Sequence, residues 1–142
     1  MEKRFILYAE DDADDRFIFE EAFLHHRDQI EILQFSNGLE LINYLDTSNH
    51  AHPSLIVLDI NMPKLGGRET LKILRGYPEF RSTPIAMLTT SSLQVDADFA
   101  RQHNAMFLTK SINHSQMEKI TTQLLEYCGT ELHMDNSSSL LV

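Results

Sequence analysis

Two short hydrophobic runs, at residues 4–9 (RFILYA) and 54–59 (SLIVLD), constrain the fold of this chain most strongly. Both are largely continuous rather than alternating, which is typical of strands that helices cover on both faces of a parallel sheet. Three further runs of similar length are candidate strands, and they lie at residues 30–35, 84–89 and 105–109. The sequence therefore predicts a sheet of five strands.

Segments with helical periodicity separate these candidate strands. In the segment at residues 113–128, apolar side chains recur at helical spacing with polar residues between them. Asn37 opens the segment at residues 37–45 and is expected to cap the N-terminus of that helix. The predicted helices lie at residues 13–26, 37–45, 67–75, 92–103 and 113–128. A β-α unit repeated five times predicts an α/β fold with a doubly wound, five-stranded parallel sheet.

The chain length of 142 residues is that of one domain with a single core. We expect residues 1–129 to form that domain and residues 130–142 to be a flexible tail. No apolar run approaches the roughly 20 residues of a transmembrane helix, and the N-terminus lacks the apolar region of a secretory signal. With one cysteine, an internal disulfide is excluded. We therefore expect a cytoplasmic protein that does not associate with membranes.

The formal net charge is −9, from 21 acidic and 12 basic residues. Binding to phosphate backbones requires clustered Lys and Arg, and the chain has no basic run, so we expect no contact with nucleic acid. The nearest approach to a basic cluster is interpreted as the solvated side of a helix. It consists of Lys64, Arg68, Lys72 and Arg75. A basic protein partner or a bound cation fits the acidic excess better.

An acidic cluster follows the first predicted strand, in the stretch LYAEDDADDRF at residues 7–17. Glu10 and Asp11 stand at the end of that strand, where crowded like charges repel each other. Asp14 and Asp15 are expected in the first turn of the following helix, where negative charge suits the helix dipole.

Other polar residues end the remaining strands. Asp59 follows the third strand, Thr89 ends the fourth and Lys110 follows the fifth. Parallel strands of this fold class bring their carboxyl ends to one edge of the sheet, where ligands bind. Carboxylates from two strands form a hard-oxygen site that suits Mg²⁺, and a divalent cation would relieve their repulsion.

Four motifs in this order resemble the receiver domain of two-component response regulators, over roughly residues 3–128. They are EDD after the first strand, LIVLDINMPKLGG around Asp59, PIAMLTTSS around Thr89, and FLTK ending in Lys110. The resemblance implies a flavodoxin-like (βα)5 fold. It also implies a Mg²⁺-dependent phosphoprotein that takes part in signal transduction through a phosphorelay.

The resemblance implies a role for each site residue. Asp59 would be the phosphoacceptor, with Lys110 and Thr89 contacting the phosphoryl group. Mg²⁺ would be held by Glu10, Asp11, Asp59 and the backbone carbonyl of Asn61. Thr89 and Phe107 would form the conformational switch, and Asn61 and Ser91 would tune dephosphorylation.

The chain departs from the family pattern at three positions. Ser111 follows Lys110 where receivers usually carry a cis proline, so the sequence leaves the conformation of that peptide bond open. Gly66 replaces a usual aspartate, which loosens the loop without touching a reacting atom. Thr90 is larger than the usual residue and would narrow access for the phosphodonor.

The leading hypothesis is a stand-alone receiver, because only a short tail follows the fifth helix. It would accept a phosphoryl group from a sensor histidine kinase or a histidine phosphotransfer protein and act on an unidentified downstream protein. It would turn over no external substrate, and whether two copies pair is left open. The alternative is a receiver-like interaction module that works without phosphorylation. A flavin or nucleotide enzyme is disfavoured, because the chain lacks both phosphate-binding glycine motifs.

Overall fold

Five parallel strands form the centre of the fold in the order β2-β1-β3-β4-β5. The computed structural model describes residues 3–47 and 49–129, so the predicted tail at 130–142 lies outside the described residues. All five predicted strands are present within a residue of the expected bounds. They are β1 (Arg4–Ala9), β2 (Ile30–Phe35), β3 (Leu55–Leu58), β4 (Ile85–Thr89) and β5 (Met106–Thr109). The doubly wound flavodoxin-like prediction is confirmed.

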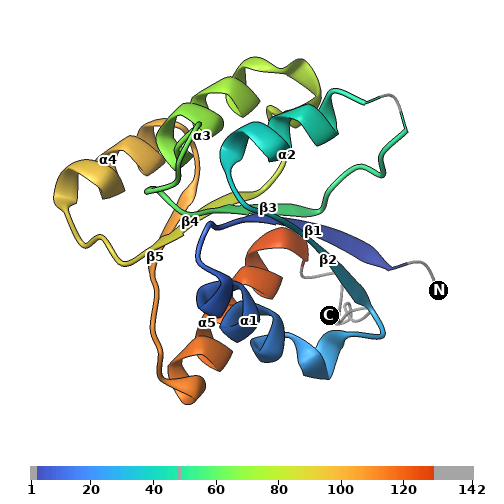
Figure 1. Ribbon diagram of the computed structural model, residues 1–142, viewed down its shortest axis with the longest axis vertical. Coiled ribbons are helices and arrows are strands. Elements are labelled where there is room, and N and C mark those ends of the chain that lie inside the picture. Colours follow the sequence, from blue (N-terminus) through green and yellow to red (C-terminus); the bar gives the residue numbers. More distant parts are fainter. Residues whose placement is uncertain (1–2, 48, 130–142) are drawn as a thin grey trace, which may run out of the picture.

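Helices cover both faces of the sheet (Figure 1). The helices α1 and α5 lie on one face and α2, α3 and α4 on the other, as expected when right-handed crossovers change direction from the middle of the sheet. Asn37 caps α2 as predicted, because its side chain accepts from the Glu40 N–H at 2.9 Å. The helix bounds are α1 (Ala13–Ala22), α2 (Gly38–Leu45), α3 (Gly67–Gly76), α4 (Gln94–Gln102) and α5 (His114–Gly129).

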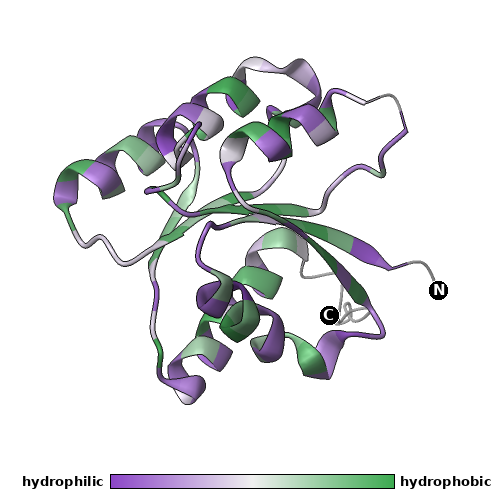
Figure 2. Ribbon diagram, in the orientation of Figure 1, coloured by the Kyte–Doolittle hydropathy of each residue, from purple (hydrophilic) through white to green (hydrophobic). Residues whose placement is uncertain are grey.

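The continuous apolar runs produce two separate cores, one on each face of the sheet. Because side chains alternate along a strand, Leu7 and Ile56 pack under α2 and α3, whereas Ile6 and Val57 face α1 and α5. The hydropathy colouring shows apolar strands in the middle and polar residues on the outer helix surfaces (Figure 2). The two faces of the sheet are therefore mainly apolar, and polar groups follow the strand ends.

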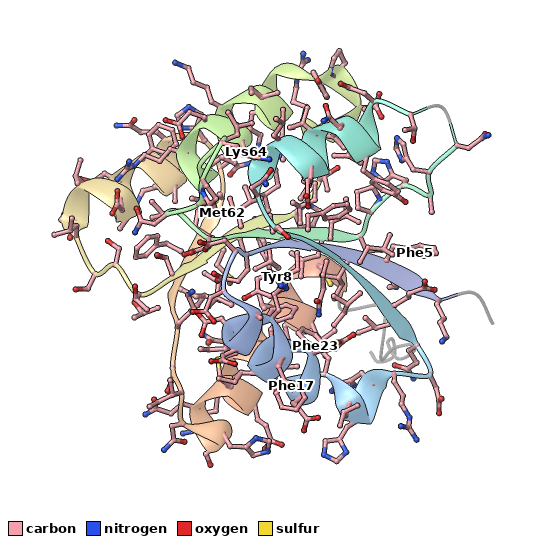
Figure 3. The ribbon with its side chains drawn as sticks, in the orientation of Figure 1. Phe5, Tyr8, Phe17, Phe23, Met62 and Lys64 are labelled. Atoms are coloured by element: carbon pink, nitrogen blue, oxygen red, sulfur yellow. The ribbon has the colours of Figure 1, made fainter. Side chains whose placement is uncertain are left out.

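The first helix is shorter than predicted. It ends at Ala22, and a separate 3-10 helix spans Leu24–His26, whereas the periodicity predicted one helix over 13–26. Phe23 leaves helical geometry at φ −99° and ψ 5°, and its buried ring packs 4.9 Å from that of Phe19. Phe17 of the same helix is 64% exposed, so it lies outside this core (Figure 3).

The basic residues that we interpreted as a solvated helix face include two structural cross-links. Arg68 is exposed as expected but also pairs with another helix, and Arg75 is only partly exposed, so the interpretation is incomplete. Arg68 bonds to Asp96 on α4. Arg75 donates to the end of α4 and to the segment before β4. Its acceptors are the carbonyl oxygens of Phe80, Arg81, Thr83, His103 and Asn104, at 2.6–3.2 Å. The guanidinium thus supplies side-chain donors to carbonyl oxygens at the end of α4 and in the segment between α3 and β4.

Replacing Arg75 by methionine should lower the free energy of unfolding by about 2–4 kcal/mol. The change removes all five charged hydrogen bonds and leaves partly buried carbonyl groups without a donor. Urea denaturation of the purified variant measures the loss. Lys72→Met removes an exposed cation from the same helix and should stay within about 0.5 kcal/mol of the parent. Equal losses in both variants would show that helix charge, rather than carbonyl contacts, is responsible.

Across residues 3–47 and 49–129, no helix combines the length and the apolar character that a membrane span requires. Polar residues also gather at the edge of the sheet where the parallel strands β1, β3, β4 and β5 end. These carboxyl ends lie toward the left of the view in Figure 1.

Candidate functional site

The end of β1 and the end of β3 bring two buried carboxylates side by side. Glu10 directly follows β1 and Asp59 directly follows β3, and the two strands are hydrogen-bonded neighbours in parallel register. The Asp59 N–H donates to the carbonyl of Ala9 at 3.1 Å, which extends the hydrogen bonding between β1 and β3 as far as Asp59. Glu10 and Asp59 are 1% and 5% exposed.

Glu10, Asp11 and Asp59 form a group of three carboxylates. One oxygen from each lies within 4.8 Å of the others, and Asp11 is the exposed member. Asp12 has a different role, since its side chain caps α1 by accepting from the N–H groups of Asp14 and Asp15 at 2.8 and 3.1 Å. The EDD motif therefore divides into two candidate ligands and one helix cap.

Lys110 follows β5 and reaches the same site. Its Nζ lies 2.6 Å from Glu10 Oε1 and 2.7 Å from Asp15 Oδ2, and 3.7 Å from Asp59 Oδ2. Assigning Asp15 only to the helix dipole was therefore incomplete, because it is a direct partner of Lys110. The sequence carries no signal for this contact, because Asp15 has the position of an ordinary acidic residue in the first turn of a helix.

Burial shifts the ionisation of these groups. Burial raises the pKa of Glu10 to about 7, although the hydrogen bond from Lys110 opposes the rise. Burial also raises the pKa of Asp59, against the charge of Lys110 and a hydrogen bond from Thr89. Burial disfavours the charge on Lys110, yet its hydrogen bonds to Asp15 and Glu10 raise its pKa above the ordinary value. Burial thus favours the neutral forms of Glu10 and Asp59, whereas the hydrogen bonds to Lys110 favour its charged form.

Thr89 is the last residue of β4 and is fully buried. Its hydroxyl accepts from the Ser91 N–H at 3.3 Å, and β4 pairs with β3, the strand that Asp59 follows. The Ser91 hydroxyl donates to Asp96 Oδ2 at 2.6 Å. Thr89 and Ser91 thus lie at the end of β4, as the sequence predicted, and their roles stay predictions.

The loop after β3 is held close to the Asp59 backbone. A Cβ atom at Gly67 would lie 2.1 Å from the Asp59 carbonyl oxygen, so only glycine fits where α3 begins. Lys64, in the same loop, has φ 66° (Figure 3). Asn61 lies in this loop and is exposed, and its proposed ligand role stays a prediction.

The other site residues take the expected positions. Phe107, on β5, is partly buried against the core on the α2, α3 and α4 face, and its switch role stays a prediction. Residues 3–47 and 49–129 contain no cis peptide bond, so the Lys110–Ser111 bond is trans. Thr90 is exposed and lines a small hollow with Asp15 and Lys110, and its effect on access for a phosphodonor stays a prediction.

The carboxylates fit a divalent cation. One oxygen from each of Glu10, Asp11 and Asp59 lies within 4.8 Å of the others, so these three residues would hold the cation. All three side chains offer hard carboxylate oxygens, and no anion-binding group is among them. The site therefore suits a cation such as Mg²⁺ better than an anion.

Comparison with known families and structures agrees with this geometry. The response regulator receiver domain matches residues 6–122. The chain belongs to this family. The receiver is 31% identical to the response regulator Rcp1 of Synechocystis sp., over 81% of this chain and 82% of Rcp1.

Two solved structures resemble this receiver along most of its length. One is the phosphorylated cyanobacterial phytochrome response regulator RcpA, with a TM-score of 0.81, 29% identity, and coverage of 89% of this chain and 94% of RcpA. The other is the Mn²⁺-bound form of Rcp1, with a TM-score of 0.79, 27% identity, and coverage of 89% and 96%.

Proposed function

We propose that this receiver accepts a phosphoryl group on Asp59 from a phosphohistidine of a sensor kinase or phosphotransfer protein. The observation that carries the proposal is the position of Asp59, with carboxylates of Glu10 and Asp11 on one side and the Lys110 ammonium 3.7 Å away. A carboxylate oxygen of Asp59 attacks phosphorus, the P–N bond breaks, and the electron pair leaves on the imidazole. An acyl phosphate and a neutral histidine result once the imidazole is protonated.

Phosphoryl transfer needs in-line positioning and compensation of charge on the equatorial oxygens. Glu10, Asp11, Asp59 and the carbonyl of Asn61 would hold Mg²⁺, which neutralises part of that charge when bound. Lys110 supplies the second cation, and the Thr89 hydroxyl can donate to a phosphoryl oxygen once Asp59 is modified. The crystal structure of the phosphorylated relative RcpA supports phosphorylation, and that of Mn²⁺-bound Rcp1 supports binding of a divalent cation.

The protein would act as a stand-alone receiver and catalyse only its own phosphorylation and dephosphorylation. Support comes from Rcp1, which this chain matches over 82% of the relative's length. Asn61 and Ser91 would tune the lifetime of the acyl phosphate, and Thr89 with Phe107 would switch the surface that a downstream protein recognises.

Incubation with Mg²⁺ and acetyl phosphate tests the proposal. The wild type should gain the mass of one phosphoryl group, and Asp59→Asn should gain none, because an amide is not a nucleophile toward phosphorus. Asp98→Asn, an exposed change on α4, is the matched control and should label like the wild type. A wild type that takes no phosphoryl group from saturating donor would instead favour the interaction module that works without phosphate.

A further inference from the structure

An ion pair joins α3 to α4 close to the phosphorylation site. Arg68, at the start of α3, donates through Nε at 2.9 Å and through a second guanidinium nitrogen to Asp96 Oδ1 in the first turn of α4. The Asp96 side chain is 2% exposed, whereas that of Arg68 is 43% exposed. A buried carboxylate is thus paired with a guanidinium that solvent or another molecule can reach.

Asp96 is bonded on its other side to the loop between β4 and α4. Its Oδ2 accepts from the Ser91 hydroxyl at 2.6 Å, and the Ser91 Oγ in turn accepts from the Leu93 N–H at 3.3 Å. These hydrogen bonds hold the pKa of Asp96 below its ordinary value. No side chain caps α4 at Leu93, so the Ser91–Asp96 contact fixes the entry to this helix.

The same loop residue is bonded to the site. Ser91 donates its N–H to Thr89 Oγ1 at 3.3 Å, and Thr89 ends β4, the strand beside the one that Asp59 follows. A chain of hydrogen bonds therefore runs from Thr89, next to the phosphoacceptor, to the surface of α3 through Ser91, Asp96 and Arg68. This chain does not pass through β5 or Phe107.

We propose that Arg68, Asp96 and Ser91 form a latch that holds the β4–α4 loop in its unphosphorylated arrangement and links the state of Asp59 to the exposed guanidinium of Arg68. The inference rests on the proposed function. A phosphoryl group on Asp59 places the acceptor oxygens further out than the carboxylate, so Thr89 has to shift to reach them. Ser91 is held by Asp96 and opposes that shift.

Thermodynamic linkage gives the direction of the effect. If the latch favours the unphosphorylated arrangement, breaking it favours the phosphorylated one, and phosphorylation weakens the latch by the same factor. The Arg68 guanidinium and the start of α4 would then move apart when Asp59 is phosphorylated. Asp96 is accordingly a positioning residue, since it acts on Thr89 through Ser91.

Initial rates of labelling by subsaturating acetyl phosphate test the latch. Asp96→Asn and Arg68→Met should label about 3- to 10-fold faster than the wild type, because both release the loop. Asp98→Asn is the matched control, since its exposed pair with Arg101 lies on the same helix and touches no loop residue; its rate should equal that of the wild type. A variant that is merely damaged would label more slowly, so an increase separates positioning from loss of structure.

Amide hydrogen exchange provides a readout that needs no phosphoryl group. The Ser91 and Leu93 N–H groups should exchange faster in Asp96→Asn than in the wild type or Asp98→Asn. Labelling rates that stay equal in all variants would overturn the latch while leaving the proposed function intact. A different outcome is a wild type that takes no phosphoryl group while the Ser91 and Leu93 amides still exchange faster in Asp96→Asn. That outcome would overturn the proposed phosphorylation of Asp59 and the latch with it, and it would leave the hydrogen bonds of Asp96 only a structural role in the loop.

Discussion

Replacing Lys110 by methionine should slow phosphorylation of Asp59 from acetyl phosphate by about 100-fold at saturating Mg²⁺. The Lys110 ammonium lies 3.7 Å from Asp59 Oδ2 and is 11% exposed, so little solvent screens it. Removing one preorganised donor from a buried site costs about 10²–10³ in rate in other enzymes. The initial rate of phosphoryl mass gain measures the effect.

Two controls isolate the charge of Lys110. Lys119→Met removes an exposed cation from α5 and should label at the wild-type rate. Circular dichroism should show Lys110→Met to be folded, because methionine retains most of the aliphatic length of lysine. A folded Lys110→Met that labels within about threefold of the wild type would remove Lys110 from the phosphoryl site.

The contact with Asp15 explains how Lys110 can respond to phosphorylation. Its Nζ is 2.7 Å from Asp15 and 2.6 Å from Glu10, and both contacts are shorter than the one to Asp59. A phosphoryl group on Asp59 adds negative charge beyond the carboxylate and competes with Asp15 for the ammonium. If Asp59 is phosphorylated as proposed, the first turn of α1 would therefore be coupled to the modification.

The fold could be predicted from the sequence because its signals are local. A strand buried on both faces needs a continuous apolar run, and each of the five runs became a strand of one sheet. Parallel strands share a carboxyl edge, so Glu10, Asp59, Thr89 and Lys110 had to meet once their strands were placed. The site was predictable to the extent that it follows from this topology.

The remaining contacts depend on helix placement, which the sequence does not reveal. Asp15 reaches Lys110 across 95 positions, and Arg68 reaches Asp96 across 28. In the sequence these charged residues look like ordinary helix-surface residues. The apolar pattern of a helix is the same whether a charged side chain contacts water or a neighbouring helix. The end of α1 at Ala22 likewise has no signal in the apolar pattern, because Phe19 and Phe23 keep the i, i+4 spacing of a continuing helix.

Magnesium should bind about 30-fold more weakly at pH about 5.5 than at pH about 8. Burial raises the Glu10 pKa from 4.5 to about 7, so a proton competes with the cation at the lower pH and is absent at the higher one. Isothermal titration calorimetry in buffers of different ionisation enthalpy measures both the affinity and the proton released.

The raised pKa of Glu10 also determines how the free energy of unfolding of the metal-free protein changes with pH. The folded state holds its proton at Glu10 more tightly than the unfolded state, so the free energy of unfolding falls as pH rises from about 4.5 through 7. The loss attributable to Glu10 is about 3 kcal/mol, and Mg²⁺ should restore stability mainly above pH about 7. Urea denaturation with Mg²⁺ or with a chelator, across this pH range, measures the difference.

Glu10→Gln provides the decisive comparison for both effects. Glutamine keeps the size of the side chain and cannot ionise, so the metal-free protein should lose this part of its pH dependence, and Mg²⁺ should bind more weakly with a flatter pH profile. Glu31→Gln, an exposed change on the edge strand β2, should behave like the wild type. If Mg²⁺ affinity stays constant between pH about 5.5 and 8 in the wild type, Glu10 does not contribute an ionised ligand, and the cation is held by Asp11 and Asp59 alone.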